Sequence, residues 1–261
     1  RTGGKGSLSD FAGGHLYFGL HRTARQWVLR EWAPNATKIY VIGEFNNWQE
    51  DEAYAMKRLP KMGNWEIKLP SKAMKHGDLY KLKVYWEGGC GERIPAWVRR
   101  VVQDEETKNF TAQFVIDKPY DWKHDDIRAP KVGELLIYES HVGMAQEKEG
   151  VGTYVEFRDE ILPRIKEAGY NAVQLMAIAE HPYYGSFGYH VSSLFAPSSR
   201  FGTADELRSL IDRAHELGIA VIMDLVHAHY VKNFNEGINE LDGSKHHYSK
   251  EGDAGYQKYW D

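Results

Sequence analysis

A carboxylate and two imidazoles come directly after one apolar run. Residues 219–223 are all apolar, and Asp224, His227 and His229 follow them. An apolar run of this kind after Gly218 predicts a strand that is buried on both faces of a parallel sheet. In parallel α/β folds, ligands bind at the carboxyl ends of the strands, and a carboxylate is costly to bury without a partner. Asp224 is therefore the first candidate for a functional side chain, and a structural buried carboxylate is the alternative.

The two histidines have the spacing of a metal-binding pair. A His-x-His pair at a strand end also occurs in metal-dependent barrel hydrolases, which makes such an enzyme an alternative reading. That class places the pair on the first strand, whereas two predicted strands precede His227 and His229 here. Imidazole ligands also need further convergent partners. We therefore predict no metal site.

Composition excludes several classes of function. The chain has 261 residues, a formal net charge of -4 and a single cysteine, Cys90. The negative charge and the lack of a basic cluster argue against a nucleic-acid partner. No apolar stretch approaches the ~20 residues of a membrane span, and no signal peptide is evident. A lone thiol suits a reducing compartment, so we expect a cytoplasmic protein without a membrane partner.

Strands and helices alternate in the second half of the chain. Buried strands are predicted at 134–139, at 219–223 and, as a third, after Gly169. Apolar spacing predicts a helix over 154–168, in which Phe157, Ile161, Ile165 and Ala168 share a face and Pro163 either starts or kinks the helix. A second helix follows Thr203, whose spacing to Glu206 is that of a capping box, with Leu207, Leu210, Ile211 and Ala214 inward.

The order strand, helix, strand, helix, strand predicts a parallel sheet with right-handed crossovers. The pattern alone leaves a doubly wound sheet and a closed barrel open. The segment 179–202 between the second strand and its helix is far longer than the usual 2–6 residues, which marks a functional loop at the strand ends. It carries Tyr183, Tyr184, Phe187 and Tyr189.

Short alternating segments fill the first hundred residues. Segments 27–32, 38–42, 64–69 and 80–86 are predicted strands, and turn residues separate them at the spacing of a β-sandwich. The chain is rich in tryptophan, and an aromatic face beside short polar groups suits a sugar, although aromatic side chains also fill β-rich cores. Trp65, on a strand, is expected in the core.

Several motifs then resemble one known family. The W-A-P-N-A sequence at 32–36 and G-E-F-N-N-W at 43–48 resemble the glycogen- and starch-binding module that precedes the barrel of branching and debranching enzymes. The segments 138–143, 174–181, 186–189, 195–203 and 224–229 resemble successive landmarks of the alpha-amylase superfamily. The sequence around 232–243 is similar to 1,4-alpha-glucan branching enzymes, and the resemblance spans nearly the whole chain.

The resemblance implies a fold and a domain order. We expect an N-terminal all-β sandwich, residues 1–118, that resembles a carbohydrate-binding module, and then a linker over 119–132. Residues 133–261 would form the first βαβαβ portion of a (β/α)8 TIM barrel and the start of the loop after its third strand. A complete barrel takes about 250 residues, so the barrel would be incomplete in this chain.

The resemblance also implies roles for individual residues. Asp224 and His229 match the first signature of the superfamily, and Tyr189 matches the tyrosine that stacks on the same sugar ring. Trp48 and Trp97 are candidates for glycan contact in the module, and packing of the module on the barrel is the alternative. The implied partner is an α-glucan such as glycogen, amylose or starch, and no metal or organic cofactor is implied.

The implied activity is that of a 1,4-alpha-glucan branching enzyme, which cleaves an α-1,4 link and passes the fragment to a 6-hydroxyl. Such a retaining reaction needs two carboxyls, and the family positions of the nucleophilic Asp and the acid Glu would lie beyond Asp261. We therefore expect no catalytic residue among residues 1–261 and no activity from them alone. A debranching or trehalose-forming relative and a non-catalytic glycan-binding protein are the alternatives.

Overall fold

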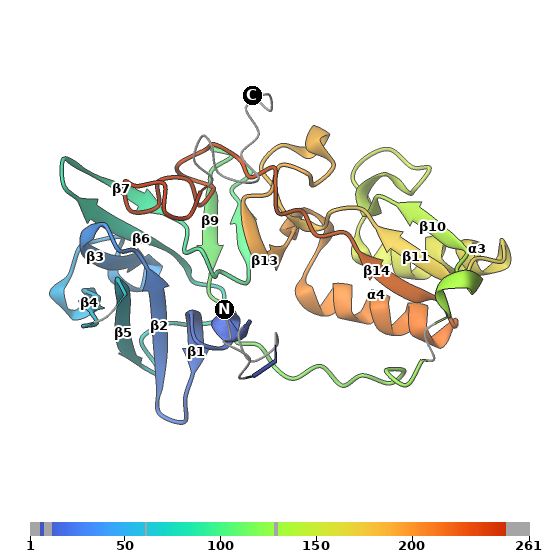
Figure 1. Cartoon of the computed structure of the whole chain (residues 1–261), viewed down its shortest axis with the longest axis horizontal. Helices are drawn as coiled ribbons and strands as arrows, with labels where there is room; N and C mark the ends of the chain where they lie inside the picture. Colours follow the sequence, from blue (N-terminus) through green and yellow to red (C-terminus); the bar gives the residue numbers. More distant parts are fainter. Residues whose placement is uncertain (1–5, 8–11, 61, 128–129, 249–261) are drawn as a thin grey trace. The chain divides into compact units, whose positions relative to one another are not determined.

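The computed structural model describes residues 6–7, 12–60, 62–127 and 130–248 (Figure 1). The chain divides into two compact units that are not continuous in sequence. Unit 1 holds the residues up to Val115, Ser192–Phe195 and the described residues from Tyr230 onward. Unit 2 holds Ile116–Val191 and Ala196–His229. Residues 249–261, which belong to the predicted barrel portion, lie outside the described residues.

Unit 1 contains two antiparallel sheets, as the predicted sandwich requires. One sheet has the order β1-β2-β5-β4 and the other β3-β6-β9-β8, with β7 paired to β6. The strands of the first sheet are β1 (Gly19–Arg22), β2 (Gln26–Trp32), β4 (Lys57–Arg58) and β5 (Asn64–Pro70). Those of the second are β3 (Ala36–Gly43), β6 (Leu79–Trp86), β7 (Gly89–Arg93), β8 (Val101–Gln103) and β9 (Phe110–Gln113).

The alternation of side chains along these strands builds the core of unit 1. In β6, Tyr80, Leu82 and Val84 are buried while the residues between them are partly exposed. This is the period-two pattern of a strand with one inward face. Trp65 on β5 is buried as predicted, and its Nε1 donates a hydrogen bond to the Ala33 carbonyl at 2.9 Å. The four strands predicted from the sequence are confirmed. The sequence did not predict β1, β4, β7, β8 and β9.

Unit 2 is built around a parallel sheet of three strands. The strands β10 (Ile137–Ser140), β11 (Ala172–Leu175) and β14 (Ala220–Met223) pair in that order, and both pairings are parallel. The helix α4 (Ala204–Glu216) connects β11 to β14 and runs along the sheet (Figure 1). The predicted order of strands and helices is confirmed.

The structure shows how the first crossover helix accommodates Pro163. It runs through α2 (Tyr154–Glu156), a π-helical turn η6 (Phe157–Ile161) and α3 (Leu162–Glu167). Pro163 sits in the first turn of α3, where its missing N–H costs little, and the wider π turn precedes it. The π turn shifts the helical phase, so Leu162 is buried and Ala168, which we predicted inward, is exposed.

Local signals at the ends of α4 are also confirmed. The Thr203 side chain accepts from the Glu206 backbone N–H, and Glu206 bonds back to the Thr203 N–H, which completes the capping box. Gly218 follows the helix with φ of 70°, the left-handed conformation that glycine adopts without steric cost. Leu207, Leu210 and Ala214 face the core with Val173, Leu175 and Ile219.

One expectation about burial is wrong. We predicted that the first strand is buried and that the third is buried on both faces. Instead, the first three residues of β10 are exposed and those of β14 are at most half-buried. Met223 at the end of β14 is 43% exposed. Parallel strands are buried only where both faces are covered and both edges are paired. Within the described residues, β10 and β14 are the edge strands of this sheet.

The long loop after β11 contains short elements. They are β12 (Ala179–Glu180), the 3₁₀ turns η7 (Tyr184–Ser186) and η8 (Ser199–Phe201), and β13 (Ser193–Pro197). The other 3₁₀ turns are η1 (Gly13–Leu16), η2 (Glu44–Asn46), η3 (Glu52–Tyr54), η4 (Val132–Glu134) and η5 (Val142–Met144). Among the described residues, no helix combines the length and apolar character that crossing a membrane requires.

Candidate functional site

The three parallel strands end at one level, and Asp224 lies at that edge. Ser140 pairs with Leu175, and Leu175 pairs with Met223, so the strands stop in register. Asp224 is the next residue after Met223, and its backbone N–H donates to the Leu175 carbonyl at 3.2 Å. The sheet ladder therefore fixes the backbone of Asp224 at the carboxyl end of β14, where barrel folds place their functional groups.

Tyr189 reaches the same edge from the long loop. Its hydroxyl donates a hydrogen bond to Oδ2 of Asp224 at 2.7 Å. Burial and then this bond raise the pKa of Tyr189 to about 12, so the phenol keeps its proton at neutral pH. The structure therefore brings together Tyr189 and Asp224, two of the residues that the sequence singled out. A phenol held against a carboxylate gives the site both an aromatic face and a fixed polar edge.

The backbone just before Tyr189 adopts a conformation that requires glycine at position 188. Phe187 has φ of 55° and Gly188 has φ of 89°. A Cβ atom on Gly188 would lie 1.7 Å from the Ala177 carbonyl oxygen, so no side chain fits there. The glycine is required twice, by the left-handed conformation and by the close approach of the backbone to Ala177. The backbone next to Tyr189 is therefore packed directly against Ala177.

Glu139 is a site residue that the sequence did not identify. It lies on β10, one residue before the strand ends, and its charge also raises the pKa of Tyr189. The Gln174 side chain on the neighbouring strand β11 donates to Glu139 Oε1 at 3.2 Å. Both residues lie at paired positions of the sheet. The signal was a charged residue at the end of a predicted buried strand, the same signal that identified Asp224.

His141 is a second residue that the sequence did not assign to the site. It follows β10 directly, is buried, and packs edge-on against Tyr184, Phe187 and Phe201 at ring distances of 5.4–5.8 Å. Within the described part of the chain neither ring nitrogen has a hydrogen-bond partner. Burial, followed by the charge of Arg200, lowers the pKa of His141, which keeps it neutral.

His229 lies five residues after Asp224, at the end of the irregular segment that leaves β14, and it is half-buried. His227 is exposed on the same segment. Among the described residues, no group of three or more His, Cys, Asp or Glu side chains has the arrangement of a metal site. The metal-dependent alternative therefore receives no support from the geometry of this edge.

The two candidate tryptophans of unit 1 have different surroundings. Trp48 is 39% exposed in the turn after η2, where Asn47 and Trp48 both have positive φ. Trp97 instead stacks on Phe18 at 5.3 Å and on Phe195 at 4.4 Å between ring centres, with interplanar angles of 19° and 15°. An indole already stacked on two protein rings has its π surface engaged, so the environment of Trp97 is that of a packing residue.

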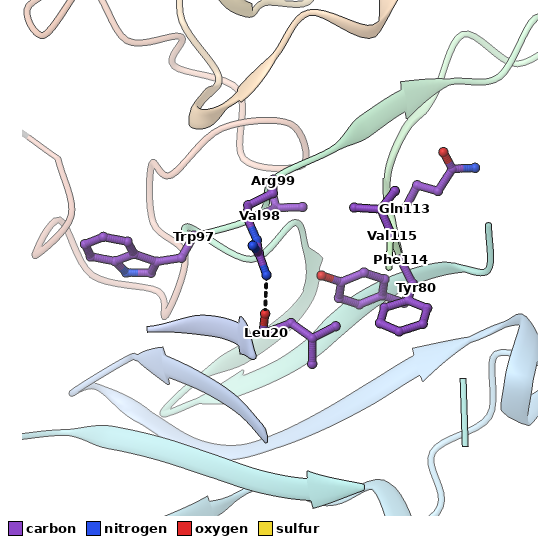
Figure 2. A pocket seen from close by; sticks show the side chains of 8 residues that line it. All are labelled: Leu20, Tyr80, Trp97, Val98, Arg99, Gln113, Phe114 and Val115. Carbon is purple, nitrogen blue, oxygen red and sulfur yellow. Dashed lines mark hydrogen bonds between the residues drawn. The ribbon is translucent and has the colours of Figure 1, made fainter. Parts of the chain in front are cut away.

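A small pocket beside Trp97 does not change this view. It lies between β1, β6 and the segments 97–99 and 113–115, and its cavity volume is about 20 Å³. This volume holds about one water molecule, and a sugar ring does not fit. Figure 2 shows the Arg99 side chain crossing the pocket to the Leu20 carbonyl, to which it donates at 2.7 Å. The indole of Trp97 points away from the other lining side chains (Figure 2).

Comparison with known families accounts for both units. Residues 17–104 match carbohydrate-binding module 48, the isoamylase N-terminal domain, and residues 150–256 match the alpha-amylase catalytic domain. The chain belongs to the alpha-amylase superfamily. It combines the N-terminal module of this superfamily with the first part of the catalytic domain, as the resemblance of its motifs implied.

Curated relatives of this superfamily member include branching enzymes. The chain is 46% identical to 1,4-alpha-glucan-branching enzyme 2-2, chloroplastic/amyloplastic, of Arabidopsis thaliana, over 98% of this chain and 32% of the relative. It is 43% identical to 1,4-alpha-glucan-branching enzyme of Dictyostelium discoideum, over 98% of this chain and 38% of the relative. The chain therefore spans about a third of the length of these relatives.

Solved structures agree on the fold. A putative alpha amylase from Salmonella typhimurium matches with a TM-score of 0.69 and 21% identity, over 84% of this chain and 34% of that chain. Pullulanase from Bacillus acidopullulyticus matches with a TM-score of 0.68 and 20% identity, over 86% of this chain and 31% of that chain. At these identities the likeness concerns the fold.

Proposed function

We propose that this superfamily member acts in its natural full length as a 1,4-alpha-glucan branching enzyme. The observation that carries the proposal is the identity of 42–46% to enzymes of that name over 98% of this chain. The substrate would be an α-1,4-glucan such as glycogen or amylose. The enzyme would cleave an α-1,4 link, hold the fragment and transfer it to a 6-hydroxyl in competition with water.

In this reaction, residues 1–261 would supply groups that bind the sugar. Cleavage of a glycosidic bond passes through an oxocarbenium-like transition state, which an aromatic face and fixed hydrogen bonds to the sugar hydroxyls stabilise. The pair of Tyr189 and Asp224 offers both groups, and His229 would join them at the same sugar. The proposal assigns neither of the two bond-breaking carboxyls to these residues.

The pair itself supports this assignment because its parts are fixed before any ligand arrives. The ladder hydrogen bond to Leu175 holds the Asp224 backbone, and the Tyr189 hydroxyl holds the Asp224 carboxylate. A site whose dipoles are already oriented needs little reorganisation when charge develops on the substrate. The pair is therefore suited to bind the transition state more tightly than the ground state.

The test is a branching assay on the protein at its natural full length. Amylose should lose iodine staining, and chain analysis should show new α-1,6 branch points. Asp224→Asn should lower the rate by about 10²-fold or more, because a preorganised polar contact to the transition state is lost. Asp205→Asn is the matched control, since Asp205 is exposed on the first turn of α4 and should leave the rate unchanged.

The outcomes separate the proposal from its alternatives. Release of linear chains from glycogen in a parallel assay, without new branch points on amylose, would indicate a debranching relative, and formation of trehalose would indicate a trehalose-forming one. Glucan binding without any reaction would indicate a glycan-binding protein. Loss of activity with a chelator and its recovery with zinc would indicate a metal-dependent hydrolase. Each of these results would overturn the branching assignment.

A further inference from the structure

Backbone and side-chain bonds close the neck of the loop that carries Tyr189. The Ser198 backbone N–H donates to the Ile178 carbonyl at 2.7 Å, and one buried carboxylate, Glu180, bonds to both sides of the neck. Glu180 is 1% exposed. Its Oε1 accepts from the His181 backbone N–H at 3.1 Å and from the Ser198 hydroxyl at 3.0 Å. Its Oε2 accepts from the Ser199 backbone N–H at 2.8 Å and from the Ser199 hydroxyl at 3.1 Å. The same side chain therefore bonds to both ends of the loop.

A charged carboxylate at this buried position is stable only when hydrogen-bond donors surround it. Burial raises the pKa of Glu180, while the hydrogen bonds from Ser199, His181 and Ser198 and the charge of Arg200 oppose that rise. A buried carboxylate without such donors costs several kcal/mol, so the neck is stable only when both strands of the chain are in place. The carboxylate thus couples the geometry of one end of the loop to that of the other.

A second pair, His181 and Arg200, strengthens the neck. His181 is fully buried, and its Nδ1 lies 2.9 Å from the Ala179 carbonyl. Arg200 donates to Nε2 of His181 at 3.2 Å and to the His181 carbonyl at 3.3 Å. Burial lowers the pKa of His181 to about 4, so at neutral pH Nδ1 donates to Ala179 and Nε2 accepts from Arg200. Both pairs join the residues near 180 to those near 199.

Tyr189 lies halfway along the loop, nine residues after Glu180 and nine before Ser198. The loop is therefore anchored at its neck through Glu180 and at its midpoint through the bond from Tyr189 to Asp224. A long segment between two fixed points has fewer conformations than one fixed at a single point. Loss of the Glu180 bonds would leave the backbone bond from Ser198 to Ile178 at the neck, so the loop would have more conformations and the Tyr189 phenol would contact Asp224 in fewer of them.

We propose that Glu180 is a positioning residue that holds both ends of the loop together and thereby keeps Tyr189 against Asp224. The inference rests on the proposed glucan site formed by Tyr189 and Asp224. It adds a residue that does not touch the sugar but sets the affinity for it. The contacts that carry it all lie among residues of unit 2.

The experiment is a double-mutant cycle read out by maltoheptaose affinity, on the protein at its natural full length. Glu180→Gln should weaken binding about tenfold, because the amide places a donor against the donors of Ser199. In a Tyr189→Ala background the same substitution should change the affinity less than twofold, since no phenol is left to position. Glu167→Gln is the matched control, since Glu167 is exposed at the end of α3.

A spectroscopic readout distinguishes positioning from a general loss of stability. The ¹³Cζ resonance of Tyr189, assigned by its absence in Tyr189→Phe, should shift in Glu180→Gln toward the value it has in Asp224→Asn. Ser199→Ala, which removes one hydroxyl donor and keeps the backbone N–H, should move the resonance and the affinity in the same direction by a smaller amount. It serves as the test if Glu180→Gln does not fold.

The possible failures are distinguishable. Equal losses of affinity in both backgrounds, or an unmoved Tyr189 resonance with unchanged affinity, would overturn the role of Glu180 while leaving the glucan site intact. Normal maltoheptaose binding by Asp224→Asn would instead overturn the glucan site itself, and the role of Glu180 would be lost with it.

Discussion

Glu31 in unit 1 and Glu180 in unit 2 are both buried glutamates, yet their surroundings differ. Glu31 accepts two backbone N–H groups, from Trp32 at 2.9 Å and from Ala96 at 2.8 Å. Burial outweighs these two bonds and raises the pKa of Glu31 to about 7. Glu180 accepts four hydrogen bonds and also experiences the charge of Arg200. Burial raises the pKa of both carboxyls, and the difference lies in the number of hydrogen-bond donors around each one.

Each carboxylate also holds the chain next to an aromatic residue that the sequence singled out. Glu31 fixes Ala96, and the adjacent Trp97 stacks on two phenylalanines. Glu180 closes the loop of Tyr189, and the tip of that ring meets the carboxylate of Asp224. One aromatic residue is thus held within a core and the other is aimed at a polar group on a strand end. The partner of the ring distinguishes a packing residue from a candidate for binding.

The largest effect should come from Gly188→Ala, which disturbs the backbone next to Tyr189 in unit 2. A Cβ at this position would overlap the Ala177 carbonyl oxygen and would also force alanine into φ of 89°. We expect a loss of about 4 kcal/mol in the free energy of unfolding, or local distortion that abolishes maltoheptaose binding. Denaturant unfolding and calorimetric titration measure the two quantities.

Gly77→Ala is the matched control for this substitution. Gly77 has φ of 99°, but a Cβ there meets nothing within 4 Å. It should cost only the backbone strain, about 1 kcal/mol, and leave glucan binding unchanged. Equal costs at the two glycines would mean that the close approach to Ala177 does not shape the loop.

Trp97→Ala should destabilise unit 1 without weakening the binding of glucan. Removal of a half-buried indole and of its two stacking contacts should cost about 3 kcal/mol. Thermal unfolding of the protein gives the stability, and affinity for soluble starch gives the function. Weaker starch binding at a temperature where the variant is fully folded would restore Trp97 as a glycan-binding residue.

Glu31→Gln should change how stability depends on pH. The folded pKa of Glu31 is about 7, above the ordinary value of 4.5, so between these two values the folded state binds more protons than the unfolded state. The contribution of Glu31 is therefore fully present below about pH 4.5 and falls as pH rises to about 7. We expect the difference in stability between wild type and Glu31→Gln to change by roughly 3 kcal/mol across this range.

Measurement of that difference is necessary because His181 titrates in the opposite sense. Its folded pKa of about 4 lies below the ordinary value of 6.5, so its contribution rises with pH over nearly the same interval. Urea unfolding of both proteins at several pH values cancels the His181 contribution. Glu87→Gln, at an exposed glutamate of unit 1, should show no such change. A difference independent of pH would show that Glu31 is ionised when buried.

The smallest effect on stability should come from Trp48→Ala. Trp48 is partly exposed, and the substitution also places alanine at φ of 59°, so we expect a loss of about 1 kcal/mol or less. If Trp48 stacks on a glucose ring, affinity for soluble starch should fall several-fold at that small cost in stability. Unchanged affinity would leave the turn after η2 without a role in glucan binding. Comparison with Trp97→Ala sharpens the contrast between an exposed and a stacked indole.

Local signals in the sequence predicted much of the fold. The glycine at 218 and the pair of Thr203 and Glu206 located the ends of α4, because left-handed backbone and capping bonds depend on neighbours in sequence. Asp224 was identified because a charged residue ended an apolar run, and the pairing of strands placed it where expected. These features need no knowledge of distant parts of the chain.

Features that depend on distant contacts were not predicted. The stacking of Trp97 involves Phe18 and Phe195, which lie far from it in sequence. The exposure of β10 and β14 depends on what pairs with their edges, and a sequence pattern does not specify this. The neck of the loop joins Glu180 to Ser199 across the whole segment. In each case the decisive partner is identified only when the chain is folded.

The most direct test of the glucan site is a double-mutant cycle on its two fixed residues. Maltoheptaose affinity should be measured by calorimetry for wild type, Tyr189→Phe, Asp224→Asn and the double variant, each at the natural full length. Each single substitution should weaken binding about tenfold, and the double variant should be little weaker than either, because both break the same 2.7 Å bond. Wild-type affinity in Asp224→Asn would contradict the account.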